Sequence, residues 1–152
     1  MTTIAFRDNI LAADTQLTVN NVKTLCHKIE FLPILNSWIA SAGPTEEVEE
    51  VLNYFRGESK KKPKGLKKFE AIVVPVSGVP YFLGAALDKN YISPNTFYAI
   101  GSGWQIAMSA MTFGMDAATS VEFTSEVDIF TNKMVDTYDS NTQRLTEIAF
   151  PA

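Results

Sequence analysis

The sequence predicts an α+β fold in which helices cover both sides of stacked β-sheets. Three observations favour this fold. The predicted elements follow the order strands, helix, strands, two helices and strand. Residues 10–13 form a continuously apolar run, which is typical of a strand covered on both faces. The chain has 152 residues, 46% of them hydrophobic, so we expect a single domain with one substantial core over residues 1–152.

The charge and the cysteine content narrow the functional classes. The net charge is −4, which argues against a general nucleic-acid-binding protein. Cys26 is the one cysteine, so no intrachain disulfide can form, as expected in a reducing compartment. The sequence has neither a signal-peptide pattern nor an apolar run near the ~18 residues that span a bilayer. We therefore expect a soluble, cytoplasmic protein without a membrane partner.

The first predicted elements are two short strands, at residues 3–6 and 10–13, joined by a turn at residues 7–9. The Asp and Asn of that turn tolerate the backbone angles of a tight hairpin. Asp14 follows the second strand directly. A carboxylate at this point is usually a turn or cap residue, and the alternative is a buried acid with a cationic partner.

A lysine in the next segment is a candidate for that partner. Residues 16–21 are polar and turn-like, and residues 22–32 can form another strand that carries Lys28. Lys28 can be a solvated residue on the strand face. If it were paired with Asp14 near the N-terminus, its charge would instead lower the pKa of a nearby hydroxyl or amine. His27 is the only histidine, so we expect no metal site and no cofactor, and interpret His27 as structural.

A strand and a well-marked helix follow. Residues 37–43 predict a strand that ends in small residues, where Gly43 can offer a backbone N–H to an anion or serve only the turn. Thr45 is the expected N-cap of the helix, and Arg56 and Gly57 end it. Four apolar residues at helical spacing predict its core-facing stripe: Val48, Val51, Leu52 and Phe55.

The central segment contains a lysine-rich loop. Residues 59–68 hold six of the thirteen basic residues, and Pro63 and Gly65 rule out a regular element. We expect this loop to be solvated, and the alternative is a docking patch for an acidic partner. Without interleaved aromatic residues, nucleic acid is not an expected partner. Residues 69–75 and 79–83 then pair naturally as a hairpin.

The last third of the chain is predicted to contain two helices. A strand at residues 97–100 leads through residues 101–103 into a helix of small residues and methionine, which Gly114 ends. A further helix is expected from about residue 116 to 131. Asp128 would lie on its inward face, where an acid needs a partner. After this helix the tail is irregular or strand-like.

The N-terminus offers a candidate nucleophile. Removal of Met1 would make Thr2 the first residue, with its hydroxyl as nucleophile and its own α-amine as base. An unperturbed α-amine titrates at about 7.7–8.0, so near neutral pH much of it can accept a proton. The alternative is an ordinary chain start.

Several short segments carry a family resemblance. They are Thr2-Thr3-Ile4-Ala5, Ala13-Asp14-Thr15-Gln16, Lys28-Ile29, residues 40–43, Ala99-Ile100-Gly101-Ser102-Gly103, Asp128 and Thr131-Asn132. Their order and spacing resemble the proteasome β-subunit family, especially its short bacterial HslV-type members. No single motif decides it, but the resemblance runs from Thr2 to about Asn132, which is most of the chain.

The resemblance implies a four-layer αββα sandwich, the N-terminal nucleophile (Ntn) hydrolase fold, and a threonine-type endopeptidase that assembles into a homo-oligomeric ring. By position, it implies that Thr2 is the nucleophile and that the Gly43 N–H is the oxyanion hole. Lys28, paired with Asp14, would tune the hydroxyl. The three residues that would hold the amine and its proton-carrying water are Ser102, Asp128 and Thr131.

The resemblance also implies partners. The substrate would be an unfolded polypeptide, delivered by a separate ATP-dependent unfoldase, because this chain has no nucleotide-binding glycine loop. Three features depart from the family pattern: Ala13 precedes the aspartate, Pro44 follows Gly43, and Glu46-Glu47 replaces an alanine-aspartate pair. Two other functions stay open, a catalytically silent ring or scaffold subunit and an amidase acting on a small molecule. Ring size and cleavage preference are also left open.

Overall fold

The strands form two five-stranded sheets and a separate hairpin in the computed structural model, which describes residues 2–151. The strand orders are β10-β1-β2-β11-β12 and β5-β6-β7-β8-β9, and β3 pairs with β4. The strands are β1 (Thr3–Arg7), β2 (Ile10–Asp14), β3 (Gln16–Val19), β4 (Val22–Leu25), β5 (Ile29–Leu32), β6 (Ser37–Ala42), β7 (Glu70–Pro75), β8 (Tyr81–Leu83), β9 (Lys89–Tyr91), β10 (Phe97–Gly101), β11 (Val135–Asp139) and β12 (Arg144–Thr146). The helices are α1 (Thr45–Phe55), α2 (Trp104–Thr112) and α3 (Ala117–Thr124).

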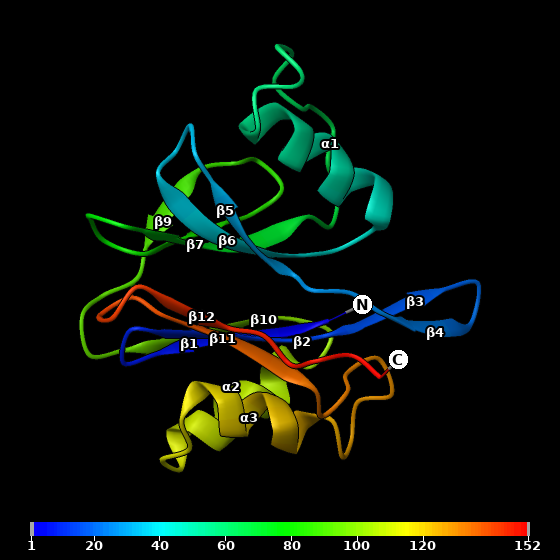
Figure 1. Cartoon of the computed structure of the whole chain (residues 1–152), viewed down its shortest axis with the longest axis vertical. Coiled ribbons are helices and arrows are strands. Elements are labelled where there is room, and N and C mark those ends of the chain that lie inside the picture. Colours follow the sequence, from blue (N-terminus) through cyan, green and yellow to red (C-terminus); the bar gives the residue numbers. More distant parts are fainter. Residues whose placement is uncertain (1, 152) are drawn as a thin grey trace.

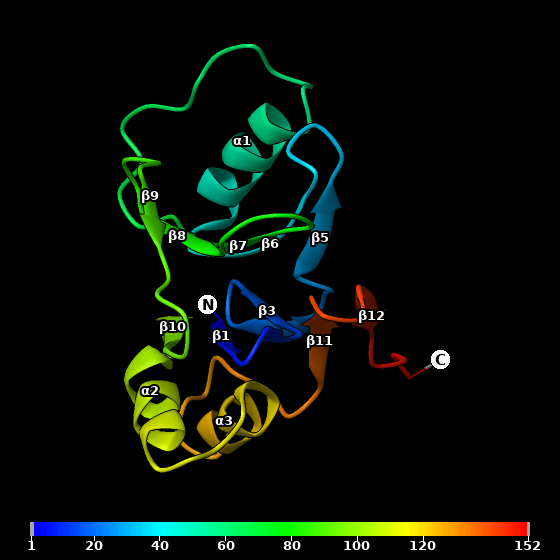
Figure 2. The ribbon, with the colours of Figure 1, turned by 90° about the vertical axis from the view of Figure 1, so that its left-hand side faces the viewer.

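The two large sheets stack face to face between layers of helix. Helix α1 covers the outer face of the β5–β9 sheet, and α2 and α3 cover the outer face of the other (Figure 1). Figure 2 shows the same four layers from the side. Three buried apolar clusters fill the spaces between successive layers. The predicted α+β fold, a four-layer αββα sandwich, is confirmed.

Strands β1 and β2 lie in the middle of this arrangement. Ile4 and Phe6 belong to the cluster between the sheets, whereas Ala5 faces α2 and α3. In β2 the same alternation places Leu11 between the sheets and Ala12 beneath the helices. Both strands are therefore apolar on both faces, as the continuous apolar run predicted. Alanine on the helix side lets α2 and α3 approach the sheet closely.

Helix α1 packs on its sheet through the predicted stripe. The stripe residues, all buried or packed against the cluster beneath α1, are Val48, Val51, Leu52 and Phe55. The expected N-cap was wrong: Pro44 holds that position, with φ −58° and ψ 140°, and Thr45 is the first helical residue. The fixed φ of proline suits this extended entry into the helix, and no side chain caps the end.

Residues 16–21 form a strand and a hairpin turn, not the expected polar turn alone. Asn20 and Asn21 have φ of 50° and 65°, the left-handed angles that a two-residue hairpin turn requires. The single strand expected over residues 22–32 is divided into β4 and β5, because the chain leaves this hairpin to join the other sheet. Lys28 lies in the link between them.

The last predicted helix is shorter than its spacing suggested. It begins after Asp116, whose side chain accepts the Thr119 N–H, and it ends at Thr124 and not near residue 131. Asp128 therefore lies in the following loop, where its Oδ1 accepts the Phe130 N–H. Such side-chain bonds to nearby backbone compete with helix formation. The tail beyond forms β11 and β12, and β9 was not predicted.

Residues 59–68 contain no helix or strand, as predicted. The end of this loop is held by Glu47, whose Oε1 accepts three successive backbone N–H groups at 3.0 Å each, from Lys67, Lys68 and Phe69. The bond from the Lys68 N–H, helped by the other two, holds the pKa of Glu47 below its ordinary value. The hairpin expected after the loop is β7 paired with β8. Within residues 2–151, every helix is too short or too polar to cross a membrane.

Candidate active site

A buried carboxylate at the end of β2 gathers the start of the chain. Asp14 is fully buried, and its Oδ1 accepts three hydrogen bonds. They come from the Thr2 hydroxyl at 3.0 Å, the Thr3 N–H at 3.1 Å and the Lys28 ammonium at 2.7 Å. A carboxylate is stable in such a place only if it is paired and hydrogen-bonded. The structure thus brings Thr2, Asp14 and Lys28 together.

The other oxygen of the same carboxylate holds two further segments. Asp14 Oδ2 accepts the Gln16 N–H at 3.2 Å and the Asn132 N–H at 3.3 Å. Asn132 also accepts the Thr15 N–H through its side chain. Sequence reasoning gave Gln16 and Asn132 no role beyond the resemblance, because backbone donors leave no residue-type signal. Together, the five hydrogen bonds that the two oxygens of Asp14 accept fix the orientation of its carboxylate.

Lys28 is nearly as buried as its partner, with 7% of its side chain exposed. Burial lowers the pKa of the Lys28 ammonium, and the charge and hydrogen bond of Asp14 oppose this effect without cancelling it. Lys28 is thus an ammonium group that loses its proton more readily than a surface lysine.

A second hydrogen-bond network joins Thr2 and Thr3 to the loop after α3. Asp128 Oδ2 accepts the hydroxyls of Ser102 and Thr131, both at 2.6 Å. Since a hydroxyl has one proton, the 2.7 Å contact between Thr131 Oγ1 and Thr3 Oγ1 is a bond that Thr3 donates. The Thr2 carbonyl accepts the Ser102 N–H at 2.7 Å, and the Ser102 hydroxyl, whose proton goes to Asp128, lies 3.3 Å from the same carbonyl oxygen.

Gly101 is required by the close approach of Thr2. A Cβ at Gly101 would lie 1.9 Å from the Thr2 carbonyl oxygen, and its φ is +94°. No other residue type would allow Thr2 to occupy its place. Sequence reasoning had marked residues 101–103 only as the entry to a helix and as part of the resemblance.

Gly43 follows β6 at the entrance to α1. Its φ of +128° and the 3.0 Å that would separate a Cβ from the Lys68 carbonyl oxygen both require glycine there. The backbone hydrogen bonds found within residues 2–151 outside regular elements include none from the Gly43 N–H. The glycine is therefore required by the turn, and its N–H stays a candidate donor for an anion.

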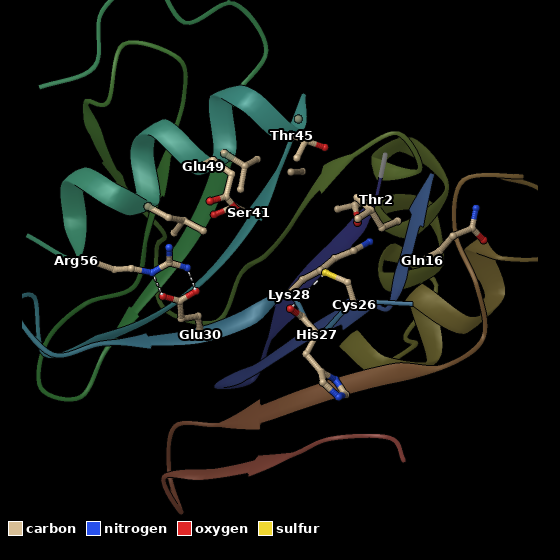
Figure 3. A pocket seen from close by; sticks show the side chains of 15 residues that line it. Thr2, Gln16, Cys26, His27, Lys28, Glu30, Ser41, Thr45, Glu49 and Arg56 are labelled. Carbon is tan, nitrogen blue, oxygen red and sulfur yellow. Dashed lines mark hydrogen bonds and ion pairs between the residues drawn. The ribbon is translucent and has the colours of Figure 1, made fainter. Parts of the chain in front are cut away.

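Thr2 and Gly43 lie at the border of two cavities. The first, which we name the Glu49 cavity, has a volume of about 200 Å³ and includes Lys28, Ser41 and Glu49 in its wall (Figure 3). The second, which Glu70 lines and which we name the Glu70 cavity, has a volume of about 480 Å³. Thr2, Ala42 and Gly43 are the residues that line both cavities.

One group of side chains within residues 2–151 has metal-ligand chemistry. His27 Nδ1 lies 2.6 Å from Asp136 Oδ2 and 3.3 Å from Glu147 Oε2, and the three ligand atoms lie within 4.8 Å of one another. His27 also stacks on Phe150, with ring centroids 4.1 Å apart. These contacts join the tail to the segment before Lys28, in keeping with a structural role for His27.

Comparison with known proteins adds to this geometry. No protein-family model and no curated protein sequence matches the chain. Among solved structures, Thiobacillus denitrificans BPH is similar with a TM-score of 0.67 at 17% identity, over 97% of this chain and 98% of that one. BPH in complex with epoxomicin gives a TM-score of 0.66 at 17% identity, with the same coverage.

A eukaryotic structure gives the same result. HslV from Trypanosoma brucei is similar with a TM-score of 0.62 at 16% identity, over 90% of this chain and 96% of that one. The likeness extends over nearly the full length of each protein, so it covers all four layers. The chain therefore has the HslV-type fold, which is the fold that its sequence resemblance implied.

Proposed function

We propose that the protein is a threonine-type endopeptidase subunit in which Thr2, after removal of Met1, is the nucleophile. One observation carries this proposal: the Thr2 hydroxyl, the Lys28 ammonium and the Asp14 carboxylate share hydrogen bonds at the border of two cavities. Met1 itself lies outside the described residues.

The proposed reaction begins with the free α-amine of Thr2. The amine accepts the hydroxyl proton as the oxygen attacks a peptide carbonyl, and the carbonyl oxygen becomes an oxyanion facing the Gly43 N–H. Collapse breaks the carbon–nitrogen bond, and the ammonium gives its proton to the leaving amine. An ester on Thr2 results. Water then attacks the ester while the amine takes its proton. The ammonium gives this proton to the Thr2 oxygen as the ester carbon–oxygen bond breaks, which releases the acid and restores the Thr2 hydroxyl and amine.

The two networks have different roles in this proposal. Lys28, held by Asp14, stabilises the negative charge that develops on the Thr2 oxygen. Ser102 holds the Thr2 carbonyl, and Asp128 with Thr131 holds Ser102 and Thr3, so the residue that carries both reacting groups cannot turn. These seven positions are the candidate catalytic and positioning residues: Thr2, Asp14, Lys28, Gly43, Ser102, Asp128 and Thr131.

The solved neighbours support the choice of substrate and assembly. HslV and BPH share the fold, and BPH has been solved with epoxomicin bound. We propose an unfolded polypeptide as substrate, a homo-oligomeric ring as the working form and a separate ATP-dependent unfoldase as a partner. Native mass spectrometry would report Met1 removal and subunit number together.

The test compares wild type with Thr2→Ala and Thr2→Ser on an unfolded polypeptide. We expect the wild type to lack Met1, to hydrolyse the substrate and to gain the mass of epoxomicin. Thr2→Ala should lose hydrolysis and the adduct while its circular dichroism stays unchanged. Thr2→Ser should keep part of the activity, because serine retains the hydroxyl without the β-branch that fixes its rotamer. A wild type that carries a free Thr2 yet cleaves nothing would favour the silent ring subunit.

A further inference from the structure

Asp136, on β11, is a buried carboxylate whose side-chain partner is the imidazole of His27. The residue is fully buried, and its Oδ1 accepts the Ile148 N–H at 2.8 Å. Its Oδ2 lies 2.6 Å from His27 Nδ1. Since a carboxylate only accepts hydrogen bonds, Nδ1 carries the proton of this contact. The ion pairs found within residues 2–151 include no lysine or arginine partner for Asp136.

A second carboxylate approaches the same ring nitrogen. Glu147 Oε2 lies 3.3 Å from His27 Nδ1, and the described chain provides no lysine or arginine partner for Glu147 either. One nitrogen carries at most one proton, so it cannot satisfy two carboxylates equally. With a neutral imidazole the group has two negative charges, and with a protonated one it still has one in excess. A divalent cation would balance both carboxylates.

The three ligand atoms already lie at distances close to those of a zinc site, all within 4.8 Å of one another. Around a tetrahedral zinc ion with bonds of about 2.0–2.2 Å, ligand atoms lie about 3.3 Å apart. The Glu147 contact has this length. The Asp136 contact must lengthen, which a side chain of His27 that is 33% exposed allows. The Ile148 N–H on Asp136 and the Phe150 ring stacked on the imidazole orient the two ligands from outside.

We propose that His27, Asp136 and Glu147 bind one Zn²⁺ ion through Nδ1, Oδ2 and Oε2, with water in the fourth position. Neutral imidazole and carboxylates are ordinary zinc ligands. Zinc would take the place of the Nδ1 proton, which leaves to solvent, while the ring keeps a proton on Nε2. The ion and its water can enter from solvent, because the side chains of His27 and Glu147 are 33% and 41% exposed.

The ion would join three segments: the link before β5, strand β11 and the residues after β12. In Figure 3 the His27 imidazole extends toward β11 and away from the side chain of Lys28. Zinc would therefore hold the residue that precedes Lys28 without entering the group around Thr2. The site does not depend on the proposed peptidase function. The sequence predicted no metal site, because it has one histidine and 109 residues separate His27 from Asp136.

The experiment is calorimetric titration of the full-length protein with Zn²⁺, without a histidine tag. We expect one ion per chain and a melting temperature that rises with Zn²⁺, because the ion binds the folded chain. Mg²⁺, which prefers oxygen ligands, should give neither effect. Glu147→Gln changes an exposed side chain and should keep the fold while weakening Zn²⁺ binding at least tenfold, since even outer supports of a metal site contribute that much. His27→Gln should weaken binding at least as much.

The neighbouring thiol provides the control. Cys26 precedes His27 and is the one cysteine of the chain, so it is the other zinc-binding side chain of this segment. Cys26→Ser should keep the wild-type affinity. Absence of Zn²⁺ binding by the wild type, or an unchanged affinity in Glu147→Gln, would overturn the assignment and leave the group as a hydrogen-bonded contact. Loss of binding in Cys26→Ser would also overturn it and place the ion on the thiol.

Nitrogen NMR of the wild type tests the assignment without any substitution. His27 is the only histidine, so its two ring nitrogens give the only imidazole signals of the chain. Added Zn²⁺ should change the Nδ1 signal to that of a metal-bound nitrogen, while Nε2 keeps its proton. Unchanged signals at saturating Zn²⁺, or coordination through Nε2, would refute the proposed geometry.

Discussion

Two groups of polar side chains meet at Thr2, and they differ in how completely they are paired. On one side, Asp14 accepts five hydrogen bonds and Lys28 is held against it. On the other, the wall of the Glu49 cavity contains the buried Ser41 hydroxyl, which has no partner in the described chain, and Glu49, which is exposed to solvent. The first group is fully paired within the described chain, whereas the second includes one buried hydroxyl that is not.

The difference separates two functions of polar groups in one site. A fully paired network fixes positions, because each member is held by several bonds and has little freedom to move. Polar groups left unpaired beside it cost stability unless something else binds them. A site built this way can hold Thr2 rigidly and still leave a polar group beside it free to bind a ligand. The predictions below test the paired side in order of decreasing effect.

The largest effect is expected from removing the charge at the centre of the network. Asp14→Asn leaves Lys28 buried without an anion, so the free energy of unfolding should fall by about 3–5 kcal/mol. Lys28→Met should cost less, because Asp14 keeps four hydrogen bonds from other donors. Chemical denaturation measures both variants. Equal losses would mean that the network does not depend on the ion pair. Both variants should lose peptidase activity.

The next prediction concerns pH. Because burial lowers the pKa of Lys28, the alkaline limb of kcat/KM should fall at a lower pH than the ~10.4 of an ordinary lysine. At pH values between the lowered pKa of Lys28 in the folded chain and its ordinary pKa in the unfolded chain, the unfolded chain binds more protons than the folded one. The contribution of Lys28 to the free energy of unfolding should therefore rise with pH across this window. A profile of activity and stability from neutral to high pH checks both signs, and Lys28→Met, which has no such group, is the stability control.

A smaller effect is expected at the support of the Thr2 carbonyl. Ser102→Ala removes the hydroxyl bond to Asp128 but keeps the backbone bond from the residue 102 N–H to that carbonyl at 2.7 Å. The free energy of unfolding should fall by about 0.5–1.5 kcal/mol and activity should fall more steeply than stability. Ser109→Ala, which removes only an exposed bond within α2, is the control. Similar kinetics for the two variants would deny Ser102 a positioning role.

The smallest effect is expected at the end of the lysine-rich loop. Glu47→Ala removes the acceptor shared by three N–H groups, so the amides of Lys67, Lys68 and Phe69 should exchange hydrogen faster. Peptidase activity should change little. Glu46→Ala, one residue earlier on the same helix turn, should leave those amides protected. Hydrogen exchange followed by mass spectrometry reads both variants, and unchanged protection in Glu47→Ala would contradict the assignment.

The sequence predicted the layers and the Thr2–Asp14–Lys28 group better than it predicted boundaries. The order of the predicted elements indicated helices on both sides of stacked sheets, and the family resemblance implied the four-layer sandwich. The sequence left two interpretations open for Asp14 and for Lys28. They could form a buried ion pair, or they could be a turn residue and a solvated lysine. Which reading holds depends on how the sheets stack, and a local pattern does not contain that information.

The errors had local physical causes. Asn20 and Asn21 turn a polar stretch into a hairpin, and Asp128 bonds to the backbone where helical spacing suggested more helix. The wall of the Glu49 cavity was not foreseen, because the helical spacing was used only to place Val48 and Leu52 toward the core and gave Glu49 no role. An acid within an apolar stripe was the signal that could have found it.

The bond between Asp14 and Lys28 joins the two halves of the sandwich. Asp14 ends a strand of one sheet, and Lys28 lies just before β5, the first strand of the other. The group around Thr2 therefore spans the boundary between the two sheets. Its geometry depends on how the end of β2 and the start of β5 are placed relative to each other.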